Sequence, residues 1–553
     1  MKSCAGSFEV RGPKGGRSNS FASAPAGGGR AIRRLIVGAL LLCLGWLPGN
    51  LRAATPFENP GAVTPTSKLD ELVFARLQEL NLTPAQLCSD PVFIRRVYLD
   101  VIGTLPSALE ARRFILDRDP AKRGKLIEQL LARDEYADYL ALRWGDILRI
   151  KAEFPINLWP NAAQSYHRWL RDAFRTNQPS DQFARDLLTS SGSNFEVPPV
   201  NFYRAMQTRT PAGIARTVAL TLLGERADHW PSNDVAALAA FFANVGYKST
   251  SEWKEEIVFF NPVSTNAGAL HGSPRPAVLP DGTRVTLSAD TDPRVVFADW
   301  LVKSPQFAQV VVNRAWYWLL GRGIVQEPDD FRTDNPPSNP ALLNYLAGQF
   351  QTSGYDFKAL YRLILNSKTY QLASLPKSGT PEAAANFASY PLQRLDAEVL
   401  IDALDQITGT NELYSSAIPE PYTFIPDDLR SIALPDGSIT SSFLELFGRP
   451  PRDTGLASER NNHLTAAQKQ WLLNSSVMQR KIESSRMIAF QTSTNRPPAD
   501  VVTGMYLGIL SRFPTAAETS AAENYFQSGI LRKQATVDLA WALMNTTEFL
   551  YRH

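Results

Sequence analysis

The segment D-P-R-V-V-F-A-D-W-L (Asp292–Leu301) and the following V-V-V-N-R-A-W-Y-W-L-L-G-R-G-I-V-Q-E-P-D-D-F-R (Val310–Arg332) carry the strongest information about the fold. An unpaired charge buried in apolar surroundings is strongly unfavourable, so polar groups placed there need partners. The segment therefore predicts one specific packed arrangement, and its Gly321-Arg-Gly323 predicts the end of a helix. The polar residues set among its apolar ones are Asp299, Asn313, Arg314, Asp329, Asp330 and Arg332.

Helical periodicity extends outward from this segment on both sides. Upstream, L-D-E-L-V-F-A-R-L-Q-E-L places its apolar residues on one face of a 3.6-residue period, and residues 67–248 continue as short helical segments. A further helix start is predicted at Thr83-Pro84, because N-caps and first-turn prolines open helices. Downstream, helices continue to His553 and are interrupted by an irregular loop at about 413–462. A loop of that length is usually functional or an interaction surface.

Residues 254–290 have a different pattern. E-E-I-V-F-F and P-A-V-L-P-D-G-T-R-V-T-L predict two or three short strands with a turn at Asp281-Gly282. The expected fold is mainly α, with two helical domains and a small β-rich insertion between them. The predicted parts are a leader at 1–54, a linker at 55–66, helical domains at 67–250 and 292–553, and the insertion at 251–291.

The N-terminal leader differs from the rest of the chain. R-A-I-R-R precedes the apolar run Leu35–Leu47, and small residues follow at Ala53-Ala54. This order predicts a secretory signal, and the run is shorter than the roughly 20 residues that span a bilayer. We expect a periplasmic or secreted envelope protein without a membrane span after cleavage, with retention as an anchor as the alternative. Arg33-Arg34 leaves both general and twin-arginine export open.

Removal of the leader would reverse the net charge. Residues 1–54 carry eight Lys or Arg and one Asp or Glu, so the formal charge would change from +3 to 49 − 53 = −4. Nothing in that balance indicates a nucleic-acid partner. Cys4 and Cys43 lie within the leader, and Cys88 would remain as a single cysteine. An internal disulfide is therefore not expected after cleavage.

R-R-V-Y-L-D-V-I-G-T-L-P-S (Arg95–Ser107) resembles the signature of a helical domain abundant in planctomycetes and verrucomicrobia. It is the domain of unknown function 1549, also called the second planctomycete cytochrome-associated domain. Asp292–Tyr370 and the C-terminal D-L-A-W-A-L-M-N-T-T-E-F-L-Y-R-H resemble its usual partner, the domain of unknown function 1553. The resemblance implies a secreted protein of a family often linked to c-type cytochromes. Envelope redox chemistry and polysaccharide turnover are its supposed roles, and no activity is established.

The chain departs from this family at two cysteine-containing segments. Many relatives carry C-x-x-C-H where this chain has Thr221–Trp230, and C-x-C-E-R where it has Gly455–Arg460. Phe447–Pro450 and Glu459-Arg460 match the family, but the chain has no C-x-x-C. Covalent haem attachment needs two thiols and an axial His, so we expect no haem and no other cofactor. The paired loss suggests that the two segments once served one metal or haem.

Arg314 with Asp329 and Asp330 is the candidate catalytic group. A guanidinium could hold a substrate while two close carboxylates with different pKa values act as acid and base. The alternative is a structural network in which Arg314 ties a buried helix to the P-D-D-F loop. No G-x-S-x-G elbow, P-loop or Rossmann fingerprint is present. Candidate ligand-binding residues are Asp299, Asn313, Arg332, Glu459, Arg460 and His463, and solvated loop charge is the alternative for the last three.

Two further polar groups have simple structural interpretations. Arg96 and Asp100 are four residues apart on the helix that carries Arg95, so an ion pair within that helix is expected. Asp228-His229-Trp230 could contain a metal ligand or a base. No two histidines of the chain have H-x-H or H-E-x-x-H spacing, and we expect no bound metal.

Ten of the chain's tryptophans follow the leader. Exposed indoles stack on sugar rings and cations, but most of these tryptophans lie at the spacing of a helical core. The first functional hypothesis is a non-catalytic envelope protein that binds a polysaccharide or a protein partner through the 413–462 loop and the cleft between the two halves. The second is a glycan-processing enzyme with the carboxylate–arginine site. The third is a redox protein with non-covalent haem or metal.

Overall fold

The computed structural model describes residues 55–264, 266, 274–493 and 496–553. These residues belong to one compact unit. The predicted signal segment lies outside the described residues. None of the helices in the described ranges combines the length and the apolar character that crossing a membrane requires.

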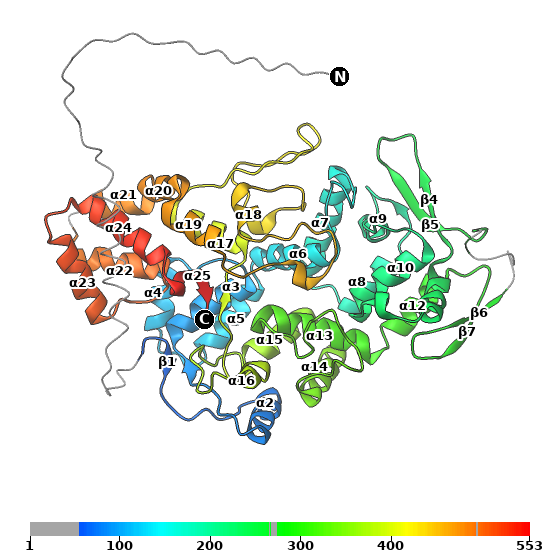
Figure 1. Cartoon of the computed structure of the whole chain (residues 1–553), viewed down its shortest axis with the longest axis horizontal. Helices are drawn as coiled ribbons and strands as arrows, with labels where there is room; N and C mark the ends of the chain where they lie inside the picture. Colours follow the sequence, from blue (N-terminus) through cyan, green and yellow to red (C-terminus); the bar gives the residue numbers. More distant parts are fainter. Residues whose placement is uncertain (1–54, 265, 267–273, 494–495) are drawn as a thin grey trace, which may run out of the picture. The chain divides into compact units, whose positions relative to one another are not determined.

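Helices make up most of the described chain, which confirms the prediction of a mainly α fold (Figure 1). The helices of the first half are α2 (Lys68–Glu79), α3 (Asp90–Val101), α4 (Ala108–Leu116), α5 (Lys122–Leu131), α6 (Asp134–Ile147), α7 (Pro160–Arg175), α8 (Ser180–Thr189), α9 (Asn201–Arg204), α10 (Pro211–Val218) and α11 (Ser232–Ala239). Those that follow are α12 (Pro293–Leu301), α13 (Pro305–Leu320), α14 (Pro340–Thr352), α15 (Phe357–Leu365), α16 (Pro381–Ala385) and α17 (Ala397–Thr408). The last are α18 (Ser442–Leu446), α19 (Ala466–Asn474), α20 (Ser476–Glu483), α21 (Arg486–Ser493), α22 (Pro498–Ile509), α23 (Ala516–Phe526), α24 (Arg532–Met544) and α25 (Thr547–Leu550).

Local sequence explains where many of these helices begin and end. Ser107 and Glu110 form a capping box at the start of α4, in which each side chain accepts the backbone N–H of the other residue. Helix α13 follows the N-cap Ser304 and ends at Gly321, whose φ is 70°. Glycine adopts this left-handed conformation without the steric cost of a Cβ. The predicted helix end at Gly321 is therefore confirmed.

The strands form small antiparallel sheets between and around the helices. Strand β5 (Glu256–Phe260) pairs with β3 (Gly192–Ser193) and with β4 (Val245–Ser249). Strands β6 (Arg275–Val278) and β7 (Arg284–Leu287) form a hairpin around Asp281-Gly282, which confirms the short strands and the turn predicted there. Two further pairs join distant segments: β1 (Glu58–Asn59) with β2 (Leu87–Cys88), and β8 (Gln393–Arg394) with β9 (Tyr551–Arg552).

The helix start predicted at Thr83-Pro84 is wrong. This segment is extended and leads into β2. Ala85 donates its backbone N–H to the carbonyl of Ala388 at 2.7 Å, and Cys88 donates to that of Gln371 at 2.8 Å. Partners some 300 residues away along the chain thus replace the helical hydrogen bonds, and a local Thr-Pro signal carries no information about them.

Helix α3 is buried on all sides. All its residues from Val92 to Val101 are buried, unlike a surface helix with one apolar face. Arg95 and Arg96 use their guanidinium groups to bind carbonyl oxygens of distant residues. Arg95 donates to the carbonyls of Ile509 and Phe549, and Arg96 donates to those of Tyr370, Leu372 and His553. The C-terminal residues therefore lie beside α3 (Figure 1).

The expected ion pair between Arg96 and Asp100 does not form among the described residues. Asp100 instead pairs with Arg552 at 2.9 Å. It also accepts hydroxyl hydrogen bonds from Tyr370 at 2.8 Å and Tyr390 at 2.9 Å. A buried carboxylate needs a full set of partners, and these come from other segments because α3 lies inside the fold.

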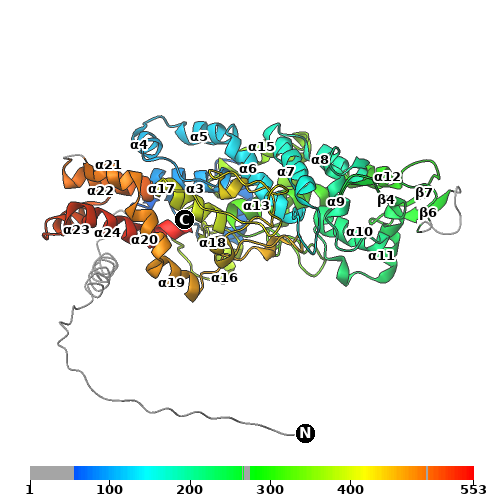
Figure 2. The ribbon, with the colours of Figure 1, turned by 90° about the horizontal axis from the view of Figure 1, so that it is seen from above.

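Two hydrophobic clusters fill the compact unit. The larger one takes residues from Leu69 to Ala457 and includes helices α2 to α8 and α12 to α15. The smaller one combines Leu99 and Leu105 with residues of α17, α22 and α24. Figure 2 shows α21 to α24 in one group and strands β4, β6 and β7 in another. Both clusters include residues from before and after position 292. The division of the chain into two domains therefore stays a prediction.

Candidate functional site

Arg314 and Asp329 form a buried ion pair at the centre of the predicted catalytic group. Their side chains are 1% and 2% exposed, and Arg314 Nη2 lies 2.9 Å from Asp329 Oδ1. Arg314 also donates to the carbonyls of Leu220 and Thr221. The second carboxylate oxygen of Asp329 accepts the backbone N–H of Ala457 at 2.6 Å. Both oxygens of Asp329 are therefore occupied, which is the geometry of the structural alternative.

Asp330 points to a different arginine from its neighbour Asp329. It pairs with Arg332 at 3.0 Å, and the Arg332 side chain is 42% exposed. The structure therefore does not hold the two carboxylates on one shared arginine. Asn313 binds the loop after α13 instead: its amide donates to the carbonyl of Val325 and accepts the Val325 N–H, both at 2.9 Å.

Asp299 and His463 lie apart from this group. Asp299 is half exposed on α12 and pairs with Arg185 of α8. His463 is exposed, and its backbone N–H binds the side chain of Asn461. Glu459 accepts the backbone N–H groups of Asp453 at 3.0 Å and of Thr454. It thereby shapes the loop that precedes Arg460.

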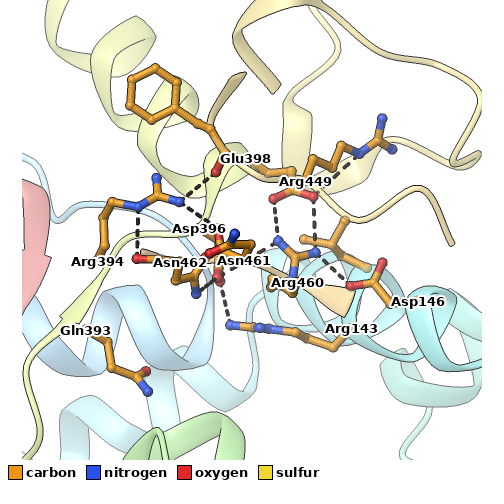
Figure 3. A network of polar contacts seen from close by, with 12 residues as sticks. Arg143, Asp146, Gln393, Arg394, Asp396, Glu398, Arg449, Arg460, Asn461 and Asn462 are labelled. Atoms are coloured by element: carbon orange, nitrogen blue, oxygen red, sulfur yellow. Dashed lines mark hydrogen bonds and ion pairs between the residues drawn. The ribbon is translucent and has the colours of Figure 1, made fainter. Parts of the chain in front are cut away.

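Arg460 reaches into a buried network of charged residues (Figure 3). Its side chain is 6% exposed and donates to Glu398 at 2.6 and 3.1 Å and to Asp146 at 2.7 Å. Asp146 on α6 also pairs with Arg452 at 2.9 Å. Glu398 lies on α17, with Arg449 at 3.5 Å. Solvated loop charge was the alternative interpretation of Arg460, and its burial argues against that alternative.

Asp396 forms the other side of this network. It pairs with Arg143 at 2.5 Å and accepts the amide of Asn462 at 2.7 Å and the hydroxyl of Tyr139 at 3.1 Å. Burial acts to raise the pKa of Asp396, but the charges of Arg143 and Arg460 outweigh it and hold that pKa well below its ordinary value. The carboxylate is therefore ionised throughout the physiological pH range.

The segment that contains Ala457 and Arg460 connects the Arg314–Asp329 ion pair to the charged network around Arg460. Its Ala457 N–H binds Asp329, Asp329 binds Arg314, and Arg314 binds the carbonyls of Leu220 and Thr221. One ion pair thus links segments 221–230 and 455–460. These are the segments where members of the family that the chain resembles carry cysteines. Their separation of more than 200 residues in sequence disappears in the folded chain.

A small cavity adjoins the network. It offers about 30 Å³ to water-sized particles. Its polar lining comes from α6, from the β8–β9 pair and from the 455–462 segment: Arg143, Asp146, Gln393, Arg460, Asn462 and Arg552. Figure 3 shows five of these side chains, from segments that are far apart in the sequence.

A larger cleft of about 430 Å³ lies between α4, α17 and the loop after α17. Six carboxylates line it: Glu110, Glu135, Asp402, Asp405, Glu412 and Asp428. Burial raises the pKa of Asp402 to about 6. Both of its oxygens accept backbone N–H groups, from Ser431 at 2.7 Å and Ile432 at 3.1 Å. Asp402 therefore holds the loop in place and has no free oxygen for a substrate.

His229 lies exposed at a shallow groove, beside Asp234 and Arg332. Its neighbour Asp228 is 84% exposed and pairs with Arg216 at 3.5 Å. Across the described ranges, no three His, Cys, Asp or Glu side chains gather in an arrangement that could hold a metal ion. Cys88 is a buried free thiol.

Three aromatic side chains from distant segments meet at the surface, and we call Trp159, Trp253 and Tyr422 the aromatic patch. The ring centroids of Trp159 and Tyr422 are 5.2 Å apart, and those of Trp159 and Trp253 are 6.4 Å apart. Trp253 is 65% exposed and Tyr422 is 49% exposed. Trp159 directly precedes α7, Trp253 lies between β4 and β5, and Tyr422 lies in the loop after α17.

The backbone under the patch is held in an unusual conformation. Trp159 has φ 72° and ψ 148°, a region that bulky residues avoid. Its N–H binds the carbonyl of Ala152 at 3.2 Å. The Ala417 N–H binds the Glu153 carboxylate at 3.1 Å and so ties the loop before Tyr422 to the same turn. Strained residues of this kind cluster at ligand-binding sites.

Comparisons with known proteins identify two domains of the chain. Residues 68–220 match the family described as "Protein of unknown function (DUF1549)", PSCyt2, and residues 293–526 match "Protein of unknown function (DUF1553)", PSD1. The chain therefore carries both domains of the predicted pair, in the predicted order. No curated protein and no solved structure matches the chain. The resemblance drawn from the sequence motifs is confirmed.

Most members of the charged network were not predicted from the sequence. A usable signal is present in R-W-G-D (Arg143–Asp146) and in L-D-A-E (Leu395–Glu398), which place charges inside otherwise apolar helical segments. The aromatic patch has a weaker signal, because Trp253 follows a Ser/Thr-rich turn and not an apolar helix. Trp144, Trp316 and Trp318 are buried, as core spacing predicts, whereas Trp253 is not.

Proposed function

We propose that this protein is an exported binding protein of the cell envelope that holds a polysaccharide on the aromatic patch. The proposal depends on one observation: three aromatic rings from three separate segments are held together at the surface. The leader, with its positive start and apolar run, supports export to the envelope.

The chemistry of the patch suits sugar rings. Aromatic faces pack against the C–H faces of sugars, and fixed Trp and Tyr side chains provide large contact areas at a low cost in entropy. Lys254 places its ammonium 5.5 Å from the ring centroid of Trp159 and 5.2 Å from that of Trp253. Phe154 and Phe424, close in sequence to the patch, are 80% and 68% exposed. Exposed aromatic rings that lie together, as Trp159, Trp253 and Tyr422 do, are typical of binding surfaces.

The Arg314–Asp329 pair is better explained as structural than as catalytic. A glycan-processing enzyme needs a carboxylate with an oxygen open to the substrate. Asp329 has both oxygens occupied by protein groups, and Asp330 forms a partly exposed pair with Arg332. The carboxylate–arginine group fits a structural clamp between α13 and the 455–460 segment.

Affinity electrophoresis of the purified protein in native gels containing polysaccharides tests the proposal. A retarded band is expected with at least one neutral or acidic polysaccharide. Trp253→Ala is expected to weaken that retardation about tenfold, which corresponds to the roughly 1.4 kcal/mol of one stacked ring. The matched control is Phe490→Ala, an aromatic side chain that is 53% exposed on α21.

The two variants separate the possible results. Loss of retardation in Trp253→Ala but not in Phe490→Ala supports the aromatic patch as the binding site. Equal behaviour of both variants, or no retardation in any polysaccharide, contradicts the proposal and favours a protein partner. A visible absorption spectrum tests the redox alternative separately, because bound haem produces a Soret band.

A further inference from the structure

We infer that a cavity between α11, α12 and the β6–β7 turn binds a small quaternary ammonium cation. The site is separate from the aromatic patch, and the inference does not depend on the polysaccharide proposal. Three observations support it: the size and apolar walls of the cavity, two indole rings that bind carboxylates there, and the negative charge of its walls.

The first observation is the size and composition of the cavity. Its volume is about 380 Å³, within the range of roughly 300–1,000 Å³ that is typical of small-molecule sites. Side chains of α11 and of the β6–β7 turn form apolar parts of its walls, among them Leu238, Leu279 and Pro280. A ligand with an apolar body of several carbon atoms therefore fits here better than a bare inorganic ion.

The second observation is a pair of half-buried indole rings whose N–H groups bind carboxylates. Trp230 Nε1 donates to Glu225 Oε2 at 2.9 Å, and Trp300 Nε1 donates to Asp281 Oδ2 at 2.8 Å. All four residues line the cavity. Each hydrogen bond orients its ring and places a negative charge at the ring edge. Because the indole is the aromatic group whose face attracts cations best, both pairs attract a positively charged ligand.

The third observation is the charge of the walls. Glu225, Asp234 and Asp281 line the cavity, whereas no Lys, Arg or His side chain among the described residues does. Glu225 is half-buried and accepts hydrogen bonds from the neutral side chains of Trp230 and Gln306. Burial raises the pKa of Glu225, with these hydrogen bonds acting against it. A cation in the cavity would offset the cost of burying this charge.

The positively charged side chains nearby line a different surface. Arg226 and Arg332 line the shallow groove beside His229. Arg332 pairs there with Asp330 and Asp334, at 3.0 and 3.5 Å. Neither arginine forms an ion pair with Glu225 in the part of the chain that the structure describes. The groove therefore contains both signs of charge, and the cavity contains only negative charge.

The hydrogen bonds also favour one kind of cation. Both oxygens of Glu225 and both oxygens of Asp281 already accept a donor from the protein. A primary ammonium group or a hard metal ion uses carboxylate oxygens as direct acceptors or ligands. A quaternary ammonium group has no N–H to donate and is held by charge and by aromatic faces. These walls therefore suit a quaternary ammonium best.

Isothermal titration calorimetry of the purified protein with choline tests the inference. Choline is compared with its neutral carbon analogue, in which a tert-butyl group of the same shape replaces the trimethylammonium group. Saturable binding of choline to one site is expected, and the analogue should bind at least about tenfold more weakly because it lacks the charge. No binding of choline, or equal affinity for the two compounds, would overturn the inference.

Two variants with the same change in net charge locate the site. Glu225→Gln keeps the shape of the side chain and an acceptor for the Trp230 N–H but removes the charge. It is expected to weaken choline binding at least about tenfold. Asp290→Asn is the matched control, because Asp290 is exposed between β7 and α12 and does not belong to the cavity lining. Equal choline affinities of these two variants would contradict the proposed site.

Two further variants distinguish this cavity from the aromatic patch. Trp300→Phe keeps an apolar ring, but a phenyl face attracts cations less than an indole face, so choline binding should weaken by about threefold to tenfold. Trp253→Ala alters the patch, where the Lys254 ammonium already lies near the rings of Trp159 and Trp253, and should leave choline binding unchanged. Choline binding that is lost in Trp253→Ala, or that is unchanged in Trp300→Phe, would also overturn the inference.

Discussion

Replacement of Arg460 by methionine is the sharpest test of the buried network. Methionine keeps most of the length of the arginine stem but removes the guanidinium. The change leaves Glu398 and Asp146 without their shortest contacts, at 2.6 and 2.7 Å. Glu398 is fully buried, so water does not replace its lost partner. The expected result is a large loss of stability with little change in packing.

The size of the loss follows from the contacts. Arg460 donates three charge-assisted hydrogen bonds to Glu398 and Asp146. At about 1.5–3 kcal/mol each, they set an upper limit of about 5–9 kcal/mol. Glu398 retains Arg449 at 3.5 Å and Asp146 retains Arg452 at 2.9 Å. We therefore expect a loss of about 3–5 kcal/mol, the usual effect of breaking a buried ion pair.

Thermal and urea unfolding measure this loss. For a unit of about 500 residues the unfolding entropy is roughly 1 kcal/mol per kelvin, so the midpoint should fall by about 3–5 °C. Arg332→Met is the matched control, because Arg332 is 42% exposed and such a pair contributes less than about 1 kcal/mol.

The comparison with Arg332→Met can refute the reasoning. If Arg460→Met lowers stability no more than the control, the network is solvated in solution and its burial does not govern its energetics. The double variant Arg460→Met with Glu398→Gln gives a second test. It should lose less stability than the sum of the single variants, by about 1–3 kcal/mol, because it leaves no unpaired charge at position 398.

Three further predictions follow from other parts of the fold. Burial lowers the pKa of His167 from 6.5 to about 3, so between pH 6.5 and pH 3 only the unfolded chain protonates this histidine. The free energy of unfolding should therefore fall by up to about 1.4 kcal/mol per pH unit as the pH drops through this range. Urea unfolding at a series of pH values measures this dependence, which should be shallower in His167→Phe. Asp329→Asn should lose about 3–5 kcal/mol and Asp330→Asn less than about 1 kcal/mol in the same assay, and equal losses would contradict the structural clamp. Gly348→Ala should raise the free energy of unfolding by about 0.5–1 kcal/mol, because the helix interior has open space there. Gly213→Ala should lower it, because the added Cβ would lie 2.4 Å from a backbone oxygen. Calorimetric unfolding midpoints that move in the same direction for both variants would contradict this geometry.

Much of the secondary structure could be predicted because its causes are local. The capping residues, the helix end at Gly321 and the hairpin at Asp281-Gly282 depend on residues a few positions apart. The error at Thr83-Pro84 shows the limit of such signals, since backbone groups of residues 371–390 bind the segment in an extended form. The 413–462 loop was predicted as irregular, and it contains only short helices such as α18.

The candidate site could be predicted only in part. The segment 292–332 correctly indicated that Arg314 and Asp329 need partners, and they find each other. Arg96 and Asp100 needed partners as well, but a spacing of four residues predicted the wrong ones. Spacing along a helix identifies partners for surface charges, whereas buried charges bind whichever groups the packing brings to them.

The sequence alone determined the mainly helical fold, the hairpin at Asp281-Gly282 and the pair of domains, because helical period, turn residues and motifs are read over short spans. The tertiary structure alone decided how the charges pair and which aromatic side chains meet at the surface. Arg460 meets Asp146 across 314 positions, and Trp159 meets Tyr422 from another segment. Such contacts form because the two hydrophobic clusters bring together segments that are far apart in the sequence. No local sequence pattern predicts which distant segments will meet.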